Sequence, residues 1–240
     1  GLGDVYKRQT LVPGLSSNGG AGQLGPTLTL VTDGLISGSR SWARQGQGIA
    51  LIYTTAAGKV MLAETTDAPT NDTWDTTEQI FDIGTAYTSV SDPALCADSD
   101  GRLFATWVTR FGDGTWYILA SMRNSATDPW SDPVVVTSGD YEYKDVHIST
   151  STVTMPTGND EIVLLASWDG DNVVNAAISP LDCMAFLPLQ EVSDNTDTCR
   201  QSDSMCMDQT YGYLYDVLFA WSLSDGNWDI VLDHADFETP

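Results

Sequence analysis

The 240-residue sequence lacks any apolar run long enough for a membrane-spanning helix, and its longest apolar runs have the length of a strand. Basic residues are also scarce, with 10 against 33 acidic ones, so the formal net charge is -23. Such a surface repels nucleic acids and anionic membranes, so we expect neither nucleic-acid binding nor membrane insertion of this segment. The acidity fits a surface adapted to saline water, calcium-binding loops, or attraction of a cationic ligand.

Cysteine and histidine are few, and their spacing gives little support to a zinc site. No C-x-x-C pair occurs, and the two histidines, His147 and His234, lie far apart in sequence. The four cysteines fit two disulfides formed in an oxidising compartment, with buried thiols as the alternative. Cys183 with Cys199 is the preferred disulfide, and Cys199 with Cys206 is its rival. The sequon at 71–73 is compatible with secretion.

Helical periodicity is absent as well, and a repeat of short strands takes its place. An apolar strand that ends in an aromatic residue occurs four times, with the aromatics at Tyr53, Trp107, Trp168 and Trp221. After a turn rich in Gly and Asp, a second strand carries an alanine in each unit, at Ala63, Ala120, Ala177 and Ala235. A short outer strand follows, and a polar crossing then leads to an acidic residue, at Asp92, Asp145 and Asp203.

These features share one period of four strands, which is typical of β-propeller blades. A four-stranded blade has two apolar faces, and packing blades around an axis covers both. A two-sheet sandwich would not require several features to recur at one period. We therefore expect an all-β propeller of four-stranded antiparallel blades over 27–240, after a flexible Gly- and Ser-rich lead at 10–26. About four blades are expected, at 39–90, 91–143, 144–201 and 202–240.

We interpret the first nine residues as a segment of different origin from the rest of the chain. The segment Asp4–Gln9 resembles a translated transposon end used to prepare sequencing libraries, which implies that residues 1–9 are a non-native tag on a metagenomic fragment. The native signal peptide would then be lost, and the chain would be part of a five- to seven-bladed propeller whose missing blades are its partners. The strand expected at Thr27–Asp33 would belong to a lost blade, or it would pair with Asn227–Ala235 and close a four-bladed ring.

Two segments carry a resemblance to a known family. Pro93–Trp107 reads like the opening of a blade of the Asp-box (bacterial neuraminidase repeat) propellers, and Ser121–Pro133 reads like the tail of one. Arg123 and Ser125 replace the Asp and Gly of the box, so the repeat is degenerate. The resemblance implies the sialidase-like superfamily, in which the box is a structural turn. It also implies core positions for Trp74 and Trp130.

By the same resemblance, a ligand would sit near the axis, where the crossings meet the turns between second and third strands. The candidate ligand-binding residues there are Arg40, Arg110, Arg200, Asp92, Asp145, Asp203 and Tyr143. Sialidases hold a substrate carboxylate with three arginines and use a tyrosine nucleophile and an aspartate as acid/base. The Arg-Ile-Pro signature of that family is absent, so the catalytic residues stay unknown. The alternative for each arginine is an ion pair with a neighbouring aspartate.

Short acidic turns suggest calcium as the one possible cofactor, because calcium prefers clustered carboxylate oxygens. The candidates are Asp98, Asp100, Asp169 and Asp171, with solvated turns as the alternative. Taken together, the sequence predicts an extracellular or cell-surface, sialidase-like propeller that binds or processes carbohydrate. If it is an enzyme, a glycoside hydrolase is expected. The alternative is a non-catalytic adhesion propeller that binds a glycan or a surface protein.

Overall fold

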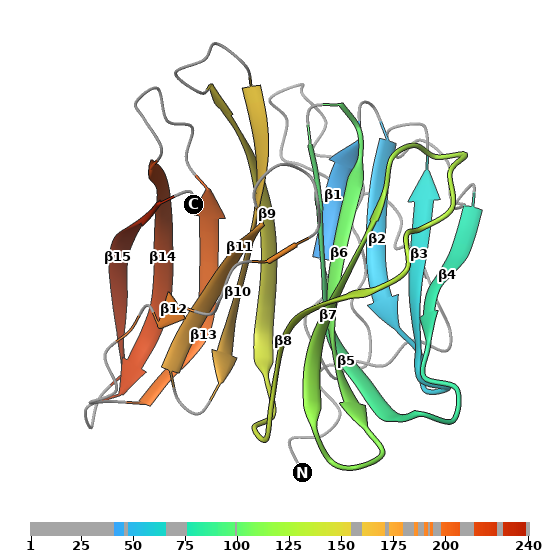
Figure 1. Cartoon of the computed structure of the whole chain (residues 1–240), viewed down its shortest axis with the longest axis horizontal. Helices are drawn as coiled ribbons and strands as arrows, with labels where there is room; N and C mark the ends of the chain where they lie inside the picture. The colour runs from blue at the N-terminus through green and yellow to red at the C-terminus, as the bar shows by residue number, and fades with distance from the viewer. Residues whose placement is uncertain are drawn as a thin grey trace, which may run out of the picture.

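The structure is a computed structural model, and every element that it contains is a β-strand (Figure 1). It describes residues 41–45, 48–65, 76–98, 100–154, 160–170, 173–179, 185–186, 190–191, 193, 198–206, 214–224 and 228–238. The segments 1–9 and 27–33 lie outside these ranges, so the predicted tag and the ring-closing strand stay predictions.

The strands form four antiparallel sheets, each a meander in chain order. The first sheet contains β1 (Ser41–Gln45), β2 (Gly48–Thr54), β3 (Lys59–Thr65) and β4 (Thr76–Asp82). The second contains β5 (Tyr87–Ala97), β6 (Leu103–Phe111), β7 (Trp116–Arg123) and β8 (Val134–Gly139). The third contains β9 (Lys144–Thr154), β10 (Asp160–Gly170), β11 (Val173–Ser179) and β12 (Gln190–Glu191). The fourth contains β13 (Thr198–Cys206), β14 (Leu214–Ser224) and β15 (Trp228–Glu238).

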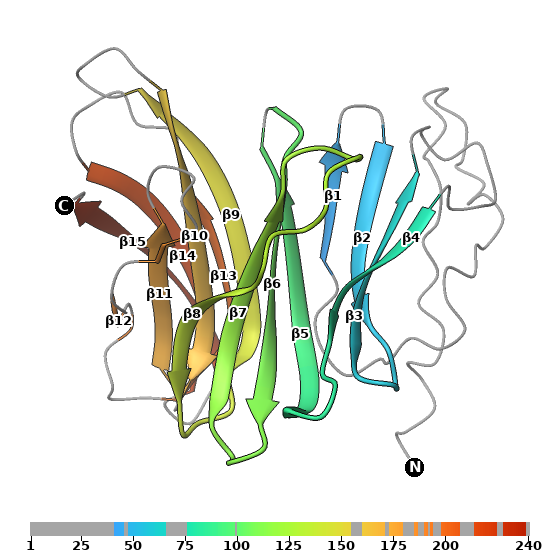
Figure 2. The same ribbon diagram turned by 45° about the vertical axis from the view of Figure 1, so that its right-hand side comes forward.

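The sheets stand side by side in chain order, as Figures 1 and 2 show from two directions. Neighbouring sheets meet through their first strands, because β1 contacts β5, β5 contacts β9, and β9 contacts β13. This is the blade arrangement of a β-propeller, so the predicted fold class is confirmed. We refer to the sheets as blades 1 to 4.

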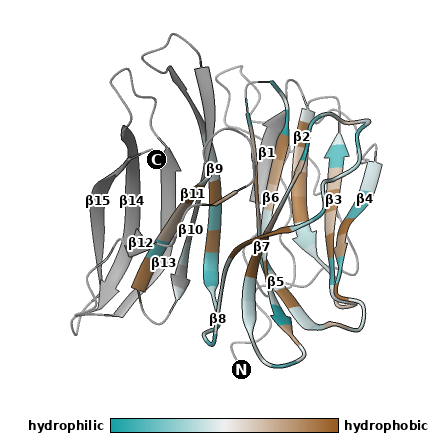
Figure 3. Cartoon of the chain, viewed as in Figure 1, coloured by the Kyte–Doolittle hydropathy of each residue, from teal (hydrophilic) through white to brown (hydrophobic). Residues whose placement is uncertain are grey.

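The core lies between the blades, and strand β6 shows why the sequence folds this way. Its residues from Leu103 to Thr109 are all buried, because side chains alternate between two covered faces. Leu103, Ala105 and Trp107 pack with residues of blade 1, whereas Val108 packs with residues of blade 3. Hydrophobic residues accordingly colour both central strands of blades 1 and 2 in Figure 3. Burying each large apolar side chain contributes about 2–3 kcal/mol.

The four repeated aromatic residues occupy the second strands of the four blades, as predicted. Trp107 packs in the layer between blades 1 and 2, and Trp168 packs in the layer between blades 2 and 3. Both indole rings are fully buried. The repeated alanines lie on the third strands, but they do not share one register. Ala63 pairs with Leu51, two residues before the aromatic of its blade, whereas Ala120 pairs with Thr106, one residue before it.

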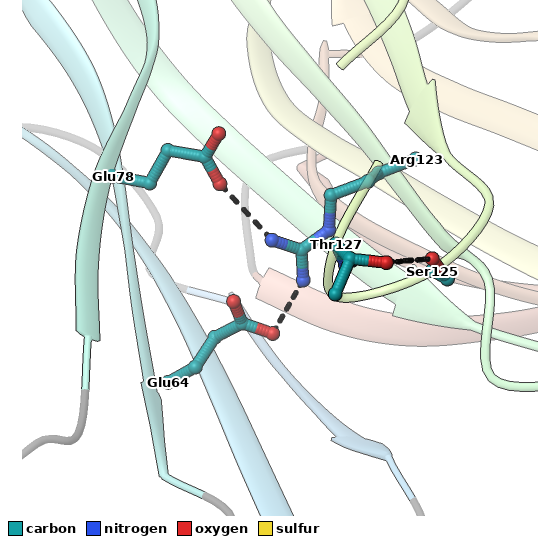
Figure 4. Close-up of polar contacts among 5 residues, drawn as sticks. All are labelled: Glu64, Glu78, Arg123, Ser125 and Thr127. Carbon is teal, nitrogen blue, oxygen red and sulfur yellow. Dashed lines mark hydrogen bonds and ion pairs between the residues drawn. The ribbon is translucent and has the colours of Figure 1, made fainter. Parts of the chain in front are cut away.

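An ion-pair cluster on Arg123 joins blades 1 and 2 (Figure 4). Arg123 ends β7, and its guanidinium donates to Glu64 at the end of β3 and, at 3.0 Å, to Glu78 in β4. The arginine side chain is only 2% exposed, and its guanidinium lies over the ring of Trp130 at 5.5 Å from the centroid. A position where the resemblance implies the aspartate of a turn therefore carries a contact between blades.

Candidate functional site

One edge of the propeller gathers the crossings between blades and the turns between second and third strands. Backbone hydrogen bonds tie them together, because Ile83 N donates to Gly58 O at 3.1 Å and Gly112 N donates to Ala86 O at 2.9 Å. We call this the crossing edge and define it by the turns 55–58 and 112–115 and the crossings 83–86 and 140–143. The predicted ligand site falls on this edge and on the first strands that begin there.

Each first strand of blades 2 and 3 contains a β-bulge opposite the central tryptophan. In β5 the register shifts between Ser91 and Ala94, so Asp92 and Pro93 together face Trp107. In β9 it shifts between Lys144 and His147, so Asp145 and Val146 face Trp168. A bulge of this kind bends the strand and changes the direction of a side chain.

The first residue of both bulges is an aspartate in the left-handed region of backbone conformation. The φ angle is 46° at Asp92 and 48° at Asp145, and these are the non-glycine residues with positive φ in the described part of the chain. Such a conformation costs an L-residue about 1–2 kcal/mol and is least unfavourable for Asn and Asp. The same conformation at one position of two adjacent blades is the observation on which a functional hypothesis for this position is built.

Asp203 does not occupy the same position in blade 4, contrary to its predicted equivalence with Asp92 and Asp145. In β13 the register shifts between Arg200 and Asp203, so Gln201 and Ser202 face Trp221. Asp203 pairs with Ala220, one residue before Trp221, which is the place that Ala94 and His147 take in blades 2 and 3. Asp203 therefore lies two residues after the bulge position that Asp92 and Asp145 occupy, although its sequence spacing suggests the same place.

Tyr143 is a core residue at the crossing edge and is not an exposed nucleophile. Its ring packs edge to face on Trp168, with 6.2 Å between centroids. It fits between two glycines, since a Cβ at Gly139 would lie 2.7 Å from the tyrosine oxygen and one at Gly170 would lie 3.1 Å from Cδ1. Burial raises the pKa of Tyr143, and the Asp140 charge raises it further against the opposing effect of a hydrogen bond with Thr137. A raised pKa disfavours the phenolate that a nucleophilic role requires.

Arg110 lies at the crossing edge near the end of β6, and its side chain contacts its own hairpin. Nε donates to the backbone oxygen of Gly114 at 3.3 Å, and the guanidinium lies over the ring of Trp116 at 5.4 Å from the centroid. Arg110 thus acts as part of an aromatic hairpin in this structure.

Asp98 lies in the turn between β5 and β6, at the opposite edge of blade 2. Its Oδ1 accepts from the backbone nitrogens of Asp100 and Arg102, both at 2.9 Å, and its Oδ2 accepts from Arg102 Nε. The Asp98 side chain is 1% exposed, whereas Asp100 is 74% exposed. Both carboxylate oxygens of Asp98 therefore stabilise the turn. No group of three or more His, Cys, Asp or Glu side chains that could hold a metal ion occurs within the described residues.

The other predicted site residues are placed only in part. Arg200 and Cys199 lie in β13, paired with Ser222 and Leu223, and Asp169 lies in β10 opposite Lys144 and Val174. Arg40, Asp171 and Cys183 lie outside the described residues. The calcium site and the disulfide stay predictions. In the described part of the chain, no helix is long and apolar enough to cross a membrane.

Comparison with known proteins gives a fold likeness without a sequence family. No protein-family model and no curated protein sequence matches the chain. An endo-arabinanase of group GH43 from Bacillus licheniformis matches with a TM-score of 0.52 and 12% identity over 87% of this chain and 74% of that chain. An α-L-arabinanase from Penicillium chrysogenum, complexed with arabinobiose, matches with a TM-score of 0.54 and 12% identity over 88% and 66%.

A Hadza microbial sialidase matches with a TM-score of 0.46 and 11% identity over 79% of this chain. The chain spans 45% of the length of that sialidase, so less than half of it has a counterpart here. At these identities the comparisons bear on the fold alone. The two arabinanase matches agree with a β-propeller, and no match assigns the chain to the Asp-box sialidases.

Proposed function

We propose that the chain is part of a propeller that binds or processes carbohydrate at the crossing edge, with Asp92 and Asp145 as the ligand-contacting carboxylates. The observation that carries this proposal is the repeated bulge, which holds an aspartate at positive φ on two first strands that contact each other. Carboxylate oxygens accept hydrogen bonds from sugar hydroxyls, and glycoside hydrolysis uses a pair of carboxylates as acid and as base or nucleophile.

The fold likeness supports a carbohydrate ligand over other ligands. Two solved propellers with TM-scores above 0.5 are named as arabinanases, and one of them is complexed with arabinobiose. Fold does not imply function, so this support is an analogy. It is independent of the bulge geometry, which supplies the two carboxylates and does not itself select the ligand.

Within carbohydrates, we take a neutral glycan as the first candidate. A sialidase mechanism needs an accessible tyrosine and arginines that can clamp a carboxylate. Tyr143 is buried with a raised pKa, and Arg110 contacts Gly114 and Trp116, whereas Tyr141 of the same crossing is exposed, so a sialic acid is tested beside the neutral glycan. Sialidase-like activity and non-catalytic adhesion remain the two alternatives that the experiment separates.

The test measures binding of arabino-oligosaccharides and of sialyllactose by calorimetry, and release of shorter sugars by chromatography. We expect arabino-oligosaccharides to bind the wild-type chain, and Asp92→Asn and Asp145→Asn to lose that binding at least tenfold. Asparagine tolerates positive φ, so both variants should keep the fold. Asp100→Asn, an exposed residue at the opposite edge, is the matched control.

Each outcome separates the candidates. Product release that depends on both aspartates supports a glycoside hydrolase, whereas binding without release supports a non-catalytic glycan-binding propeller. Preferential binding of sialyllactose would restore the sialidase-like alternative. Unchanged glycan binding in both aspartate variants would refute the proposed site.

We also propose that the protein works outside the cell or at its surface. The support is the sequon at 71–73 and the disulfide expected between Cys183 and Cys199, since Cys96 is a thiol and at most one disulfide can join the other three cysteines. Thiol titration of the denatured, unreduced protein from an oxidising host compartment tests this, and four reactive thiols would contradict it.

A further inference from the structure

The second strand of blade 2 extends further beyond its central aromatic residue, Trp107, than the second strands of the other described blades extend beyond theirs. Strand β6 continues four residues beyond Trp107, to Phe111, whereas β10 ends two residues beyond Trp168 and β14 ends three residues beyond Trp221. At about 3.4 Å per residue, the difference is about 7 Å from blade 3 and about 3 Å from blade 4. In Figure 2 the β6–β7 turn extends beyond the neighbouring strands at the crossing edge.

A chain of aromatic rings runs along this extension from the core to the solvent. Trp107 contacts Phe81 at 5.2 Å between centroids, and Phe81 contacts Tyr87 at 5.4 Å. Tyr87 then contacts Phe111 at 5.4 Å, and Phe111 contacts Tyr117 at 6.3 Å. We call Tyr87, Phe111 and Tyr117 the aromatic ridge.

The ridge is rigid and partly open. Its rings meet edge to face, with interplanar angles of 80° and 73°, and this is a favourable arrangement that fixes each ring. Phe111 at its centre is 37% exposed, and it is one of three large hydrophobic side chains recorded as exposed in the described part of the chain. A preorganised aromatic ring with solvent access binds a ligand at little entropic cost.

Two residues of the ridge, Tyr87 and Phe111, lie on the strands β5 and β6 that form the Asp92 bulge, and Tyr117 lies on the neighbouring strand β7. Tyr87 pairs with Phe111 at the end of β5 and β6, and Asp92 faces Trp107 four residues further along β6. The separation along the strands is about 13 Å. A single sugar ring is much shorter than this, so a ligand that contacts both places is a chain of several sugars.

A sugar chain suits this surface better than a protein partner does. Within the described residues, the other exposed large hydrophobic residues, Val135 and Tyr141, make none of the ring contacts of the ridge, so Phe111 is the one exposed large hydrophobic residue of the ridge itself. A stable protein interface usually buries more than about 1,000 Å² with a continuous core. A pyranose or furanose ring presents an apolar C–H face for an aromatic ring and hydroxyls for the two tyrosines.

From these observations we propose that the aromatic ridge is a second sugar-binding position, which makes the ligand an oligosaccharide or polysaccharide and not a mono- or disaccharide. This inference rests on the proposed function, because it extends the same carbohydrate site. In this proposal one oligosaccharide stacks a sugar ring on Phe111 and donates a hydroxyl hydrogen bond to the carboxylate of Asp92.

The test compares arabinobiose with a six-unit arabino-oligosaccharide by calorimetry on the full chain. Phe111→Leu keeps an apolar side chain and removes the ring, so affinity for the six-unit probe should fall about fivefold to tenfold while that for arabinobiose stays unchanged. Phe111→Trp enlarges the ring and should raise affinity for the longer probe. Val135→Ala, an exposed apolar residue of β8, should change neither.

The outcomes distinguish this inference from the proposed function. Equal affinity of wild type, Phe111→Leu and Phe111→Trp for the longer probe would overturn the ridge, even where Asp92→Asn abolishes binding of both probes. An equal loss for both probes in Phe111→Leu, with an unchanged melting temperature, would also overturn it. Absence of binding of either probe to the wild type would overturn both proposals.

Discussion

The guanidinium of Arg123, at the end of strand β7 in blade 2, donates a 3.0 Å hydrogen bond to the carboxylate of Glu78 in blade 1. Glu64 accepts a second bond from the same guanidinium, so two strands of one blade are tied to the next blade by one side chain. The other contacts between blades 1 and 2 in the core are apolar and have no fixed direction. A buried, directional contact fixes the relative position of the two blades.

We expect Arg123→Met to destabilise the protein by about 3 kcal/mol, which corresponds to about 6–12 °C in melting temperature for a domain of this size. The reason is that Glu64, whose side chain is 14% exposed, loses its ion-pair partner. Urea unfolding measures the effect. Lys59→Met removes an exposed pair with Asp82 and should cost less than about 0.5 kcal/mol. Equal effects of the two substitutions would contradict the role given to Arg123.

The bulge aspartates lead to a prediction about backbone strain. Asp145→Val should destabilise the fold by about 1–2 kcal/mol, because a β-branched side chain at a φ of 48° is disfavoured. Asp145→Gly should be close to neutral, because glycine adopts this conformation without a steric cost. Asp132→Val, at an exposed position without positive φ, is the control. If valine were tolerated at both positions, the strain argument for the bulge would fail.

The sequence predicts the blades well because their signal is local. The strand predicted to carry Ala63 is β3, and the aromatic residues fall on equivalent strands because burial on two faces demands apolar residues at fixed places. The spacing between features is less informative about register. Hairpin lengths differ from blade to blade, so Ala63 and Ala120 recur at a constant interval without being structurally equivalent.

The site residues were harder to predict, since they depend on contacts that sequence spacing does not carry. A bulge adds one residue to one strand, so the misplacement of Asp203 becomes visible only when its pairing with Ala220 is known. Arg123 occupies a position of the degenerate Asp box, and its partners lie 45 and 59 residues away. The Asp-Pro pair at 92–93 was the one local signal of a bulge, because proline cannot donate to a strand ladder.

Because the pKa of Tyr143 is raised, we expect the fold to lose stability at alkaline pH. In the unfolded chain the tyrosine ionises near pH 10, whereas burial holds it protonated to higher pH in the folded chain. Its contribution to stability is therefore complete below pH 10 and is lost as the pH rises toward the folded pKa.

We expect the stability difference between wild type and Tyr143→Phe to be constant from pH 7 to 9 and to shrink above pH 10. Thermal unfolding across this range measures it. Tyr141→Phe, at an exposed residue of the same crossing, should leave the pH dependence of the wild type unchanged. A constant difference up to pH 11 would contradict the assignment of a raised pKa to Tyr143.

A substitution at Asp98 distinguishes two interpretations of its turn, a calcium site and a turn that protein groups alone stabilise. Asp98 accepts hydrogen bonds from two backbone nitrogens and pairs with Arg102, whose side chain is 17% exposed. Asp98→Ala should destabilise the protein by about 1–2 kcal/mol, because it removes the acceptor of these donors and the ion-pair partner of Arg102 in a partly exposed turn. If protein groups alone hold the turn, this loss is the same in 5 mM CaCl₂ and in EDTA, at roughly the concentrations that saturate a weak extracellular calcium site. A calcium-dependent rise in the melting temperature of the wild type that disappears in Asp98→Ala, but not in Asp128→Asn, would instead establish the calcium site predicted from the acidic turn.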